Sequence, residues 1–226
     1  MLTVVLAGAS LETVPAKIAY HPVIVRHARR KGVSPLNIIL DDSLHHIAMK
    51  TLKNWRRRGR PDIVHFCLLT LTGSPLYREG RLRIIVHTCR DIVIRIAGNV
   101  RLPRHYERFK GLMSQLLRLG RVPPTGKPLM EAEKGEILDV LKKFQGYKVI
   151  AFTEKGEYYT PGRLRKLFSR VENPVVVVGA FPHGELPGEV LDRADYKVSV
   201  YESPLDAWVV LCKLLCAYEE ALREKG

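Results

Sequence analysis

An arginine-rich segment in the first third of the sequence has the residue types needed to bind phosphate. It contains Arg56, Arg57, Arg58 and Arg60, and Asp62 follows. One or two cations at the predicted end of a helix are ordinary compensation of the helix dipole. Four exceed that need, and a planar guanidinium grips phosphate through two parallel hydrogen bonds. If the chain is extended here, the Asp62 carboxylate shares a face with Arg60 and could hold that side chain in one rotamer.

A second arginine cluster surrounds the predicted start of a helix at Pro103. Arg104 and Arg108 are four residues apart and would share one helix face, with Arg101 just ahead of the first turn. Positive charges at a helix N-terminus oppose its dipole, so three arginines there cost stability unless an anion binds. The cluster therefore predicts a phosphate-binding surface.

Two loops rich in glycine and proline follow the last two predicted strands, over residues 179–187 and 200–207. Open α/β sheets bind ligands at the carboxyl ends of parallel strands, and uncharged loops suit an adenosine held by main-chain hydrogen bonds. Neither loop matches the Gly-x-Gly-x-x-Gly or Walker lysine pattern, which argues against a dinucleotide or triphosphate site. Loops of this composition also occur as plain turns, so the pattern alone leaves both interpretations open.

Two histidines and two cysteines in the first half of the chain could together form a zinc site. His65 with Cys67, and His87 with Cys89, would each share one face of a predicted strand. Two cysteines and two histidines suit zinc, but His-x-Cys is not a zinc-knuckle spacing and the neighbouring residues are apolar. We therefore expect ordinary core residues and no bound metal.

The overall composition favours a globular protein with a polyanionic partner. The 226 residues include 37 Lys and Arg against 23 Asp and Glu, a formal net charge of +14. This excess favours nucleic acid over lipid as the partner. Hydrophobic residues at 46% argue against disorder, and no apolar run approaches the roughly 20 residues of a membrane span. The first residues enter a strand without a basic leader, so we expect a cytoplasmic protein.

Strand and helix patterns alternate along the chain and predict an α/β fold, with a parallel sheet covered by helices on both faces. The predicted strands cover residues 3–9, 37–40, 62–71, 82–88, 91–96, 148–152, 174–179 and 196–200. The predicted helices cover residues 15–30, 45–57, 103–117, 137–144, 161–169, 186–193 and 206–223. The proline-rich segment 122–128 is the most linker-like stretch, although it is short.

Five sequence strings, in a fixed order, carry a resemblance to a known family. They are Arg60-Pro-Asp-Ile-Val-His65, Ser74-Pro-Leu76, Val86-His-Thr88, Arg101-Leu-Pro-Arg104 and Arg108-Phe-Lys-Gly-Leu-Met-Ser-Gln-Leu-Leu117. The chain resembles the archaeal branch of the SPOUT-class pseudouridine N1-methyltransferases of small-subunit ribosome biogenesis, the nucleolar essential protein family. One departure is Gly73 before Ser74 and Tyr77 after Leu76, where the family often has Asp and Asn.

The resemblance implies a fold and an assembly. The expected fold is one SPOUT-type α/β domain over residues 1–226. Its residues 62–120 would form a β-rich insertion that binds RNA, and residues 147–226 a deep trefoil knot that holds the cofactor. A homodimer would form across the knot. Cys212 and Cys216, four residues apart, are predicted to lie on the core face or a dimer face of the last helix.

The resemblance also implies site residues. S-adenosylmethionine would bind at Gly179, Gly184, Val200, Tyr201, Glu202, Ser203, Pro204 and Leu205, leaving S-adenosylhomocysteine as product. Small-subunit rRNA would contact Arg60, Arg101, Arg104 and Arg108, with Asp62 steadying Arg60. No residue is assigned as the catalytic base, because a carboxylate committed to Arg60 is a poor proton acceptor and solvent can serve.

The implied reaction is methylation of N1 of a pseudouridine in 16S rRNA. Uridine uses N1 for its glycosidic bond, whereas the carbon linkage of pseudouridine leaves that nitrogen free to attack a sulfonium methyl group. The alternative function is a non-catalytic RNA-binding factor in assembly of the small subunit.

Overall fold

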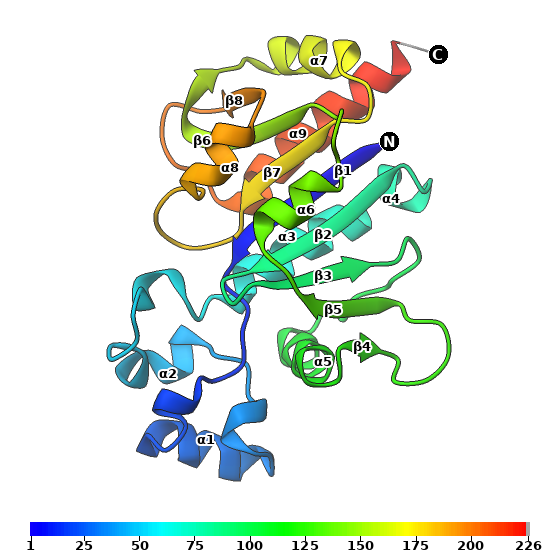
Figure 1. The fold of residues 1–226 in the computed structure, drawn as a ribbon. Helices are drawn as coiled ribbons and strands as arrows, with labels where there is room; N and C mark the ends of the chain where they lie inside the picture. The colour runs from blue at the N-terminus through cyan, green and yellow to red at the C-terminus, as the bar shows by residue number, and fades with distance from the viewer. Residues whose placement is uncertain (225–226) are drawn as a thin grey trace.

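The first strand, β1 (Leu2–Ala9), lies inside a mixed sheet with the strand order β4-β5-β3-β2-β1-β7-β6-β8 (Figure 1). The computed structural model describes residues 1–224. Strands β2, β1, β7, β6 and β8 are parallel, whereas β3, β5 and β4 add antiparallel pairs at one side. The other strands are β2 (Leu82–Thr88), β3 (Ile92–Ile96), β4 (Arg121–Val122), β5 (Met130–Lys134), β6 (Val149–Tyr158), β7 (Val175–Gly179) and β8 (Tyr196–Ser199). The predicted α/β class is confirmed, with a sheet that is parallel only in part.

Helices cover both faces of this sheet, as predicted. Side chains alternate along β1, so that Leu2, Val4 and Leu6 enter one core and Val5 and Ala7 the other. In Figure 1 α6 and α8 lie in front of the sheet, with α3 and α9 behind it. The helices are α1 (Pro22–Lys31), α2 (Asp42–Met49), α3 (Pro61–Gly73), α4 (Pro75–Arg78), α5 (Tyr106–Leu119), α6 (Ile137–Lys142), α7 (Pro161–Arg170), α8 (Gly188–Arg193) and α9 (Ala207–Arg223). Short 3-10 helices span Ala16–Ile18, Pro35–Asn37 and Trp55–Arg57.

The most consequential correction concerns residues 62–71, which form helix α3 and not the predicted strand. Pro61 occupies a first-turn position, where its missing N–H costs nothing, and Asp62 favours the same turn. The helix packs against β1, α5 and α9, and is therefore apolar around most of its circumference. A helix buried in this way has the same continuous apolar run as a buried strand, so periodicity alone does not separate them.

Three further predicted elements differ in the structure. The helix expected over 15–30 is divided, because the ring of Pro22 starts α1 afresh. The helix expected over 45–57 ends at Met49, and Asn54 takes a left-handed conformation (φ 54°) before a separate 3-10 turn. The strand expected over 37–40 makes only one bridge, between Ile39 and Thr13.

The remaining boundaries bear on the site. The helix expected from Pro103 begins at Tyr106, so Arg104 precedes it. The segment 122–128 is not a linker, because the strands on either side of it, β4 and β5, pair within the same sheet. Strands β4 and β5 were not predicted. The elements expected after residue 135 begin within two residues of the predicted positions, although β6 continues to Tyr158, six residues beyond its predicted end. No helix within residues 1–224 has the length and apolar character needed to cross a bilayer.

Residues 12–60 form a helical subdomain that projects beyond the carboxyl end of β1 (Figure 1). It has a small core of its own, centred on Ile24, Leu40 and Met49. One of its attachments to the rest of the chain is a buried ion pair at 2.7 Å between Asp41 and Lys110 of α5. The Tyr106 hydroxyl donates a second bond to the same carboxylate at 3.1 Å. Burial opposes ionisation of Asp41, but its bonds to Lys110 and Ser43 outweigh that effect and lower its pKa.

Inside this subdomain, a pair of buried histidines joins α1 to α2. The Asp41 backbone N–H donates to Nδ1 of His45 at 3.1 Å, so the proton of the neutral ring is on Nε2. That Nε2 lies 2.8 Å from Nδ1 of His27, which accepts its proton. Burial, and then the neighbouring His27, lower the pKa of His45 to about 4. His45 is therefore neutral in the folded protein at neutral pH.

We predict an acid-sensitive step in stability that depends on His45. The unfolded chain gains a proton at this residue below about pH 6.5, whereas the folded chain does so only near pH 4. The stabilisation is thus complete above pH 6.5 and decreases as the pH falls towards 4, by on the order of 3 kcal/mol. Urea unfolding from pH 7 to pH 4 measures it. His45→Gln should make the profile less steep without abolishing it, because burial also lowers the pKa of His27 and His87. His46→Gln, on the exposed side of α2, should leave it unchanged. Equal slopes in wild type and His45→Gln would contradict the assignment.

Candidate functional site

A cavity of about 410 Å³ lies at the carboxyl ends of β6, β7 and β8. Its wall is formed by residues 152–154 within β6, by 178–179 at the end of β7 with 181–186 after it, and by 198–200 at the end of β8 with 203–208 after it. Arg60, Ile63 and Val210 complete the wall. These parallel strands end at one edge of the sheet, which is where α/β folds bind ligands. The size is that of a small-molecule site. Its lining is polar and apolar in about equal parts, and the acidic side chains Glu154, Glu185 and Asp206 belong to it.

The cavity contains most of the cofactor residues predicted from sequence. Gly179, Gly184, Val200, Ser203, Pro204 and Leu205 line it. Tyr201 and Glu202 belong to the same loop but are exposed and do not line the cavity. Sequence reasoning missed the contribution of β6, Phe152 and Thr153, and of Trp208 in α9. The contribution of β6 could have been predicted, because a strand was expected to end at Phe152 and the ends of parallel strands lie at the same edge of a sheet.

Two glycines in the cavity wall are required for different reasons, one by a neighbouring side chain and one by its backbone conformation. A Cβ on Gly179 would lie 2.7 Å from the ring of Phe181, so a larger residue would displace that ring. Gly184 has a φ of 95°, in a region that side-chain-bearing residues rarely adopt. Both positions therefore keep the loop after β7 folded closely over the cavity.

Arg60 stands at the cavity, which connects the first arginine segment to this site. Its guanidinium donates to both carboxylate oxygens of Asp62, with Nε at 2.9 Å and Nη2 at 2.7 Å. The predicted contact is present, although Asp62 makes it from the first turn of α3 and not from an extended chain. The hydrogen bond to Asp62 raises the pKa of Arg60. The Arg60 side chain remains about 39% exposed, so a phosphate can still approach it.

The other arginines of this segment are not all available to phosphate, because two of them bond inside the protein. Arg58 forms a two-pronged ion pair with the buried Glu12, with Nε 2.6 Å from Oε1. Arg57 donates from Nη2 to the backbone carbonyl of Glu185 at 2.9 Å. Only Arg56 is fully on the surface, 5.5 Å over the ring of Trp55. Two of the four arginines therefore serve as internal anchors.

Arg57 also fixes an aromatic wall of the cavity. Its guanidinium carbon lies 4.0 Å from the centre of the Phe181 ring, a cation–π distance. The ring lies against Gly179 and Gly8 on the ends of β7 and β1. Arg57 thus links the helical subdomain to the loop 180–187, which closes one side of the cavity. Burial lowers the pKa of Arg57, as expected for a cation with no carboxylate partner.

The second arginine cluster is held beside the first by His65. Nε2 of His65, on α3, donates to the backbone carbonyl of Pro103 at 2.7 Å, and its ring stacks on Phe109 at 4.3 Å. This contact places the segment 101–105 against α3, one turn from Asp62. Arg101, Arg104 and Arg108 are all exposed. Arg104 and Arg108 do not share a helix face, because α5 starts after Arg104.

The four candidate zinc ligands do not share the predicted strand faces. His65 and Cys67 are on α3, where Cys67 is buried in the core, and His87 is on β2. Cys89 follows β2, with its thiol 3.5 Å from Glu12, and burial raises the pKa of both thiols. Within residues 1–224, no three His, Cys, Asp or Glu side chains converge in an arrangement that would bind metal.

Cys212 and Cys216 are exposed on α9, so the prediction of a core face is wrong. They line an apolar groove of about 260 Å³, between α9 and α7, with Tyr159, Pro161 and Leu164. The alternative prediction for these two cysteines was a dimer face, and their exposed position is compatible with it.

Comparison with known proteins gives one consistent result. Residues 4–219 match the family model described as EMG1/NEP1 methyltransferase. A relative named ribosomal RNA small subunit methyltransferase Nep1, from Thermococcus kodakarensis, is 42% identical over 222 residues, covering 98% of this chain and 99% of the relative. The protein of the same name from Thermococcus onnurineus is 40% identical over 219 residues, covering 97% and 98%.

A solved structure agrees with these sequence matches. The crystal structure of Archaeoglobus fulgidus Nep1 bound to S-adenosylhomocysteine has a TM-score of 0.87 and 37% identity to this chain. The match covers 98% of this chain and 99% of that one.

We predict that Arg57→Leu loosens the loop 180–187. The substitution removes a charge-assisted hydrogen bond and the contact with Phe181, worth about 1.5 kcal/mol. Amide hydrogen exchange in residues 180–187 should become about tenfold faster. Arg56→Leu, one residue away and facing solvent, is the matched control and should have no effect. Unchanged exchange in the Arg57 variant would show that the loop holds its position without this contact.

Proposed function

Because the chain belongs to the EMG1/NEP1 methyltransferase family, we propose that it methylates N1 of a pseudouridine in 16S rRNA. It is an rRNA methyltransferase of the small ribosomal subunit, and S-adenosylmethionine is its cofactor. The observation that carries the proposal is the position of Arg60, a phosphate-binding side chain at the cavity that fits the cofactor. An rRNA substrate makes the cytoplasm the expected place of reaction.

The cavity suits the cofactor in size and in chemistry. We assign its binding to Gly179, Gly184, Val200, Ser203, Pro204 and Leu205, with Tyr201 and Glu202 adjacent in the same loop. The glycines allow the main chain to approach an adenosine closely, and the apolar wall excludes water from its rings. When bound, the cofactor supplies an electrophilic sulfonium methyl group.

The residues of this chain act by positioning the RNA. We propose that Arg60, Arg101, Arg104 and Arg108 hold the RNA backbone through phosphate contacts, while the target base leaves its stack to enter the cavity. Asp62 keeps Arg60 in one rotamer, so its carboxylate is engaged and solvent takes the N1 proton. Alignment of N1 with the methyl carbon then accounts for most of the rate, since the displacement needs no covalent enzyme intermediate.

The fold proposal is the trefoil knot in residues 147–226, with residues 62–120 as the RNA-binding insertion. In its support, α9 packs against α7 and β7, so the chain returns beneath strands that precede it. Both cavity loops belong to this segment. A crystal structure whose main-chain trace pulls open without a crossing would overturn the knot.

The activity is tested with two RNA hairpins that differ only in a loop pseudouridine or uridine. Labelled S-adenosylmethionine should methylate the pseudouridine hairpin alone, because N1 of uridine has no proton to lose and is bonded to the sugar. Mass spectrometry of the digested RNA should place the methyl group on the base. Tight RNA binding without transfer, over a range of loop sequences, would favour the non-catalytic assembly factor.

Binding measurements on the variant Arg60→Ala test whether Arg60 belongs to the RNA site or to the cofactor site. RNA affinity should fall about tenfold, the cost of one charged hydrogen bond to phosphate. Affinity for S-adenosylhomocysteine, measured by calorimetry, should change by less than about threefold, since main-chain and apolar contacts dominate that site. Loss of cofactor binding would show that Arg60 belongs to the cofactor site instead.

We further propose a homodimer that covers the apolar groove between α7 and α9. Sedimentation equilibrium should give twice the chain mass. The double variant Cys212→Glu/Cys216→Glu should give the monomer mass, because two carboxylates would be desolvated in the interface. Lys166→Glu, an exposed residue of α7 outside the groove, is the control and should remain dimeric. A monomeric wild-type protein would refute the proposal.

A further inference from the structure

We propose that the helical subdomain, residues 12–60, is a second RNA-binding surface that contacts phosphates beyond the target nucleotide. The proposal rests on the rRNA substrate proposed above. The subdomain contains eleven Lys and Arg but only three Asp and Glu, an excess of eight positive charges. More than half of the net charge of +14 is therefore concentrated in less than a quarter of the chain.

The three acidic residues of the subdomain are already engaged. Glu12 is buried and paired with Arg58, and Asp41 is buried and paired with Lys110. Asp42 lies 2.8 Å from His46. Two of the three acidic groups are thus in the interior, and the charged groups left on the surface of the subdomain are almost all cationic.

One group of exposed cations lies along α1. Arg26, Arg29 and Arg30 are exposed, and none of them has a carboxylate of residues 1–224 within 4.0 Å. Arg29 and Arg30 gain some stability from the helix C-terminus, but Arg26 and Arg30, four residues apart, repel each other. A polyanion along this face would relieve the repulsion.

A second group lies where the first 3-10 helix meets the end of α2. The Lys17 ammonium donates to the Thr51 carbonyl at 2.7 Å, which brings Lys17 close to the exposed Lys50 and Lys53. Tyr20, in the turn that follows, is 91% exposed. An exposed aromatic ring among lysines is the arrangement that single-stranded nucleic acid binds, by base stacking and phosphate contact.

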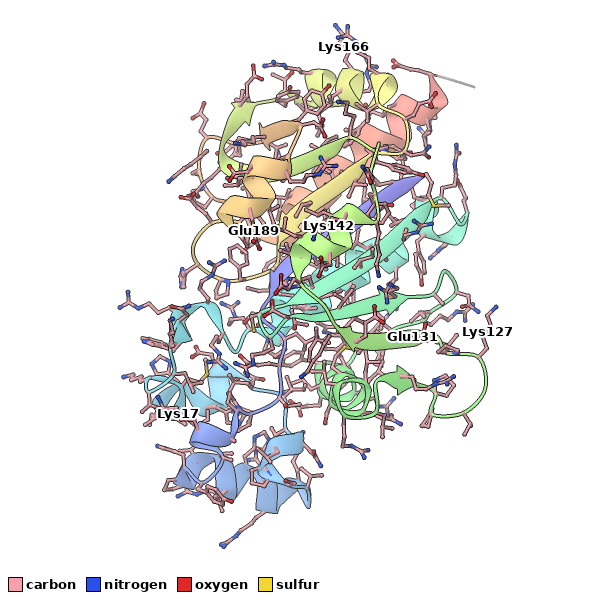
Figure 2. The ribbon with its side chains drawn as sticks, viewed as in Figure 1. Lys17, Lys127, Glu131, Lys142, Lys166 and Glu189 are labelled. Atoms are coloured by element: carbon pink, nitrogen blue, oxygen red, sulfur yellow. The ribbon has the colours of Figure 1, made fainter. Side chains whose placement is uncertain are left out.

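The subdomain is fixed on the side of the molecule where the RNA must approach. It follows β1, which is parallel to β7, so it projects from the sheet edge that carries the cavity. Lys31 pairs with Glu107, next to Arg108, and Arg57 bonds to the loop over the cavity. Figure 2 shows Lys17 at one end of the molecule and Lys166 at the other. A rigid extension adds phosphate contacts with little ordering cost.

The test compares two helices of ten residues, each with two exposed cations four apart. Arg26→Gln/Arg30→Gln changes α1, and Lys166→Gln/Arg170→Gln is the matched control in α7. Glutamine keeps helix propensity, and circular dichroism checks the fold. Fluorescence anisotropy measures binding to a short-stem pseudouridine hairpin and to the same loop on a stem longer by one helical turn.

We expect wild type and the α7 control to bind the longer RNA more tightly than the short hairpin. In the α1 variant this advantage should shrink about threefold to tenfold, and the salt dependence should weaken by about one phosphate contact per arginine. Lys50→Gln/Lys53→Gln should act in the same direction. No advantage of the longer RNA in wild type, or an equal loss in both helix variants, would overturn the proposal. If these binding differences are found but no methyl group is transferred, the proposed reaction is refuted and the second RNA-binding surface is not.

Discussion

Burial of helix α3 is the constraint on which the functional side of this protein depends. Its apolar side chains, including Ile63, Val64, Leu68 and Leu71, are almost fully removed from water between β1, α5 and α9. At about 1.5–3 kcal/mol for each large side chain, this burial fixes the helix firmly. Its first turns then position both arginine segments, since Asp62 holds Arg60 and His65 holds the segment 101–105. A shift of α3 would displace Arg60 at the cavity and the segment 101–105 together.

The cations of this protein have two different physical roles. Arg58 and Lys110 are nearly buried and each bonds to a buried carboxylate, where loss of one partner would leave an uncompensated charge. Arg57 satisfies a carbonyl and an aromatic ring instead, and so connects the helical subdomain to the cavity loop. Other cations are exposed, and some of these, such as Arg26, Arg29 and Arg30, have no carboxylate of residues 1–224 within 4.0 Å. The net charge counts buried and exposed cations alike, whereas the structure distinguishes the cations that bond internally from those on the surface.

The cavity and the arginines come from distant parts of the chain and meet because of the sheet order. Strand β1 lies between β2 and β7, which places the helical subdomain after β1 beside the loop after β7. The cavity and the arginines proposed to bind RNA therefore share one edge of the sheet, as the proposed methyl transfer between two bound molecules requires. The antiparallel strands β3, β5 and β4 widen the sheet on the other side, away from this edge.

The sequence by itself determined the α/β class, the elements after residue 135, the loops that line the cavity and the arginine segments. Those features depend on local periodicity, turn residues and charge, which a single chain segment expresses without its neighbours. Only the tertiary structure decided that residues 62–71 are a helix, since burial on most sides removes the period that distinguishes helix from strand. It also decided that Arg57 and Arg58 bond internally, because Glu185 and Glu12 are 128 and 46 residues away in sequence. Strand order and packing bring such distant residues together. The types and spacing of the residues in one segment do not reveal these contacts.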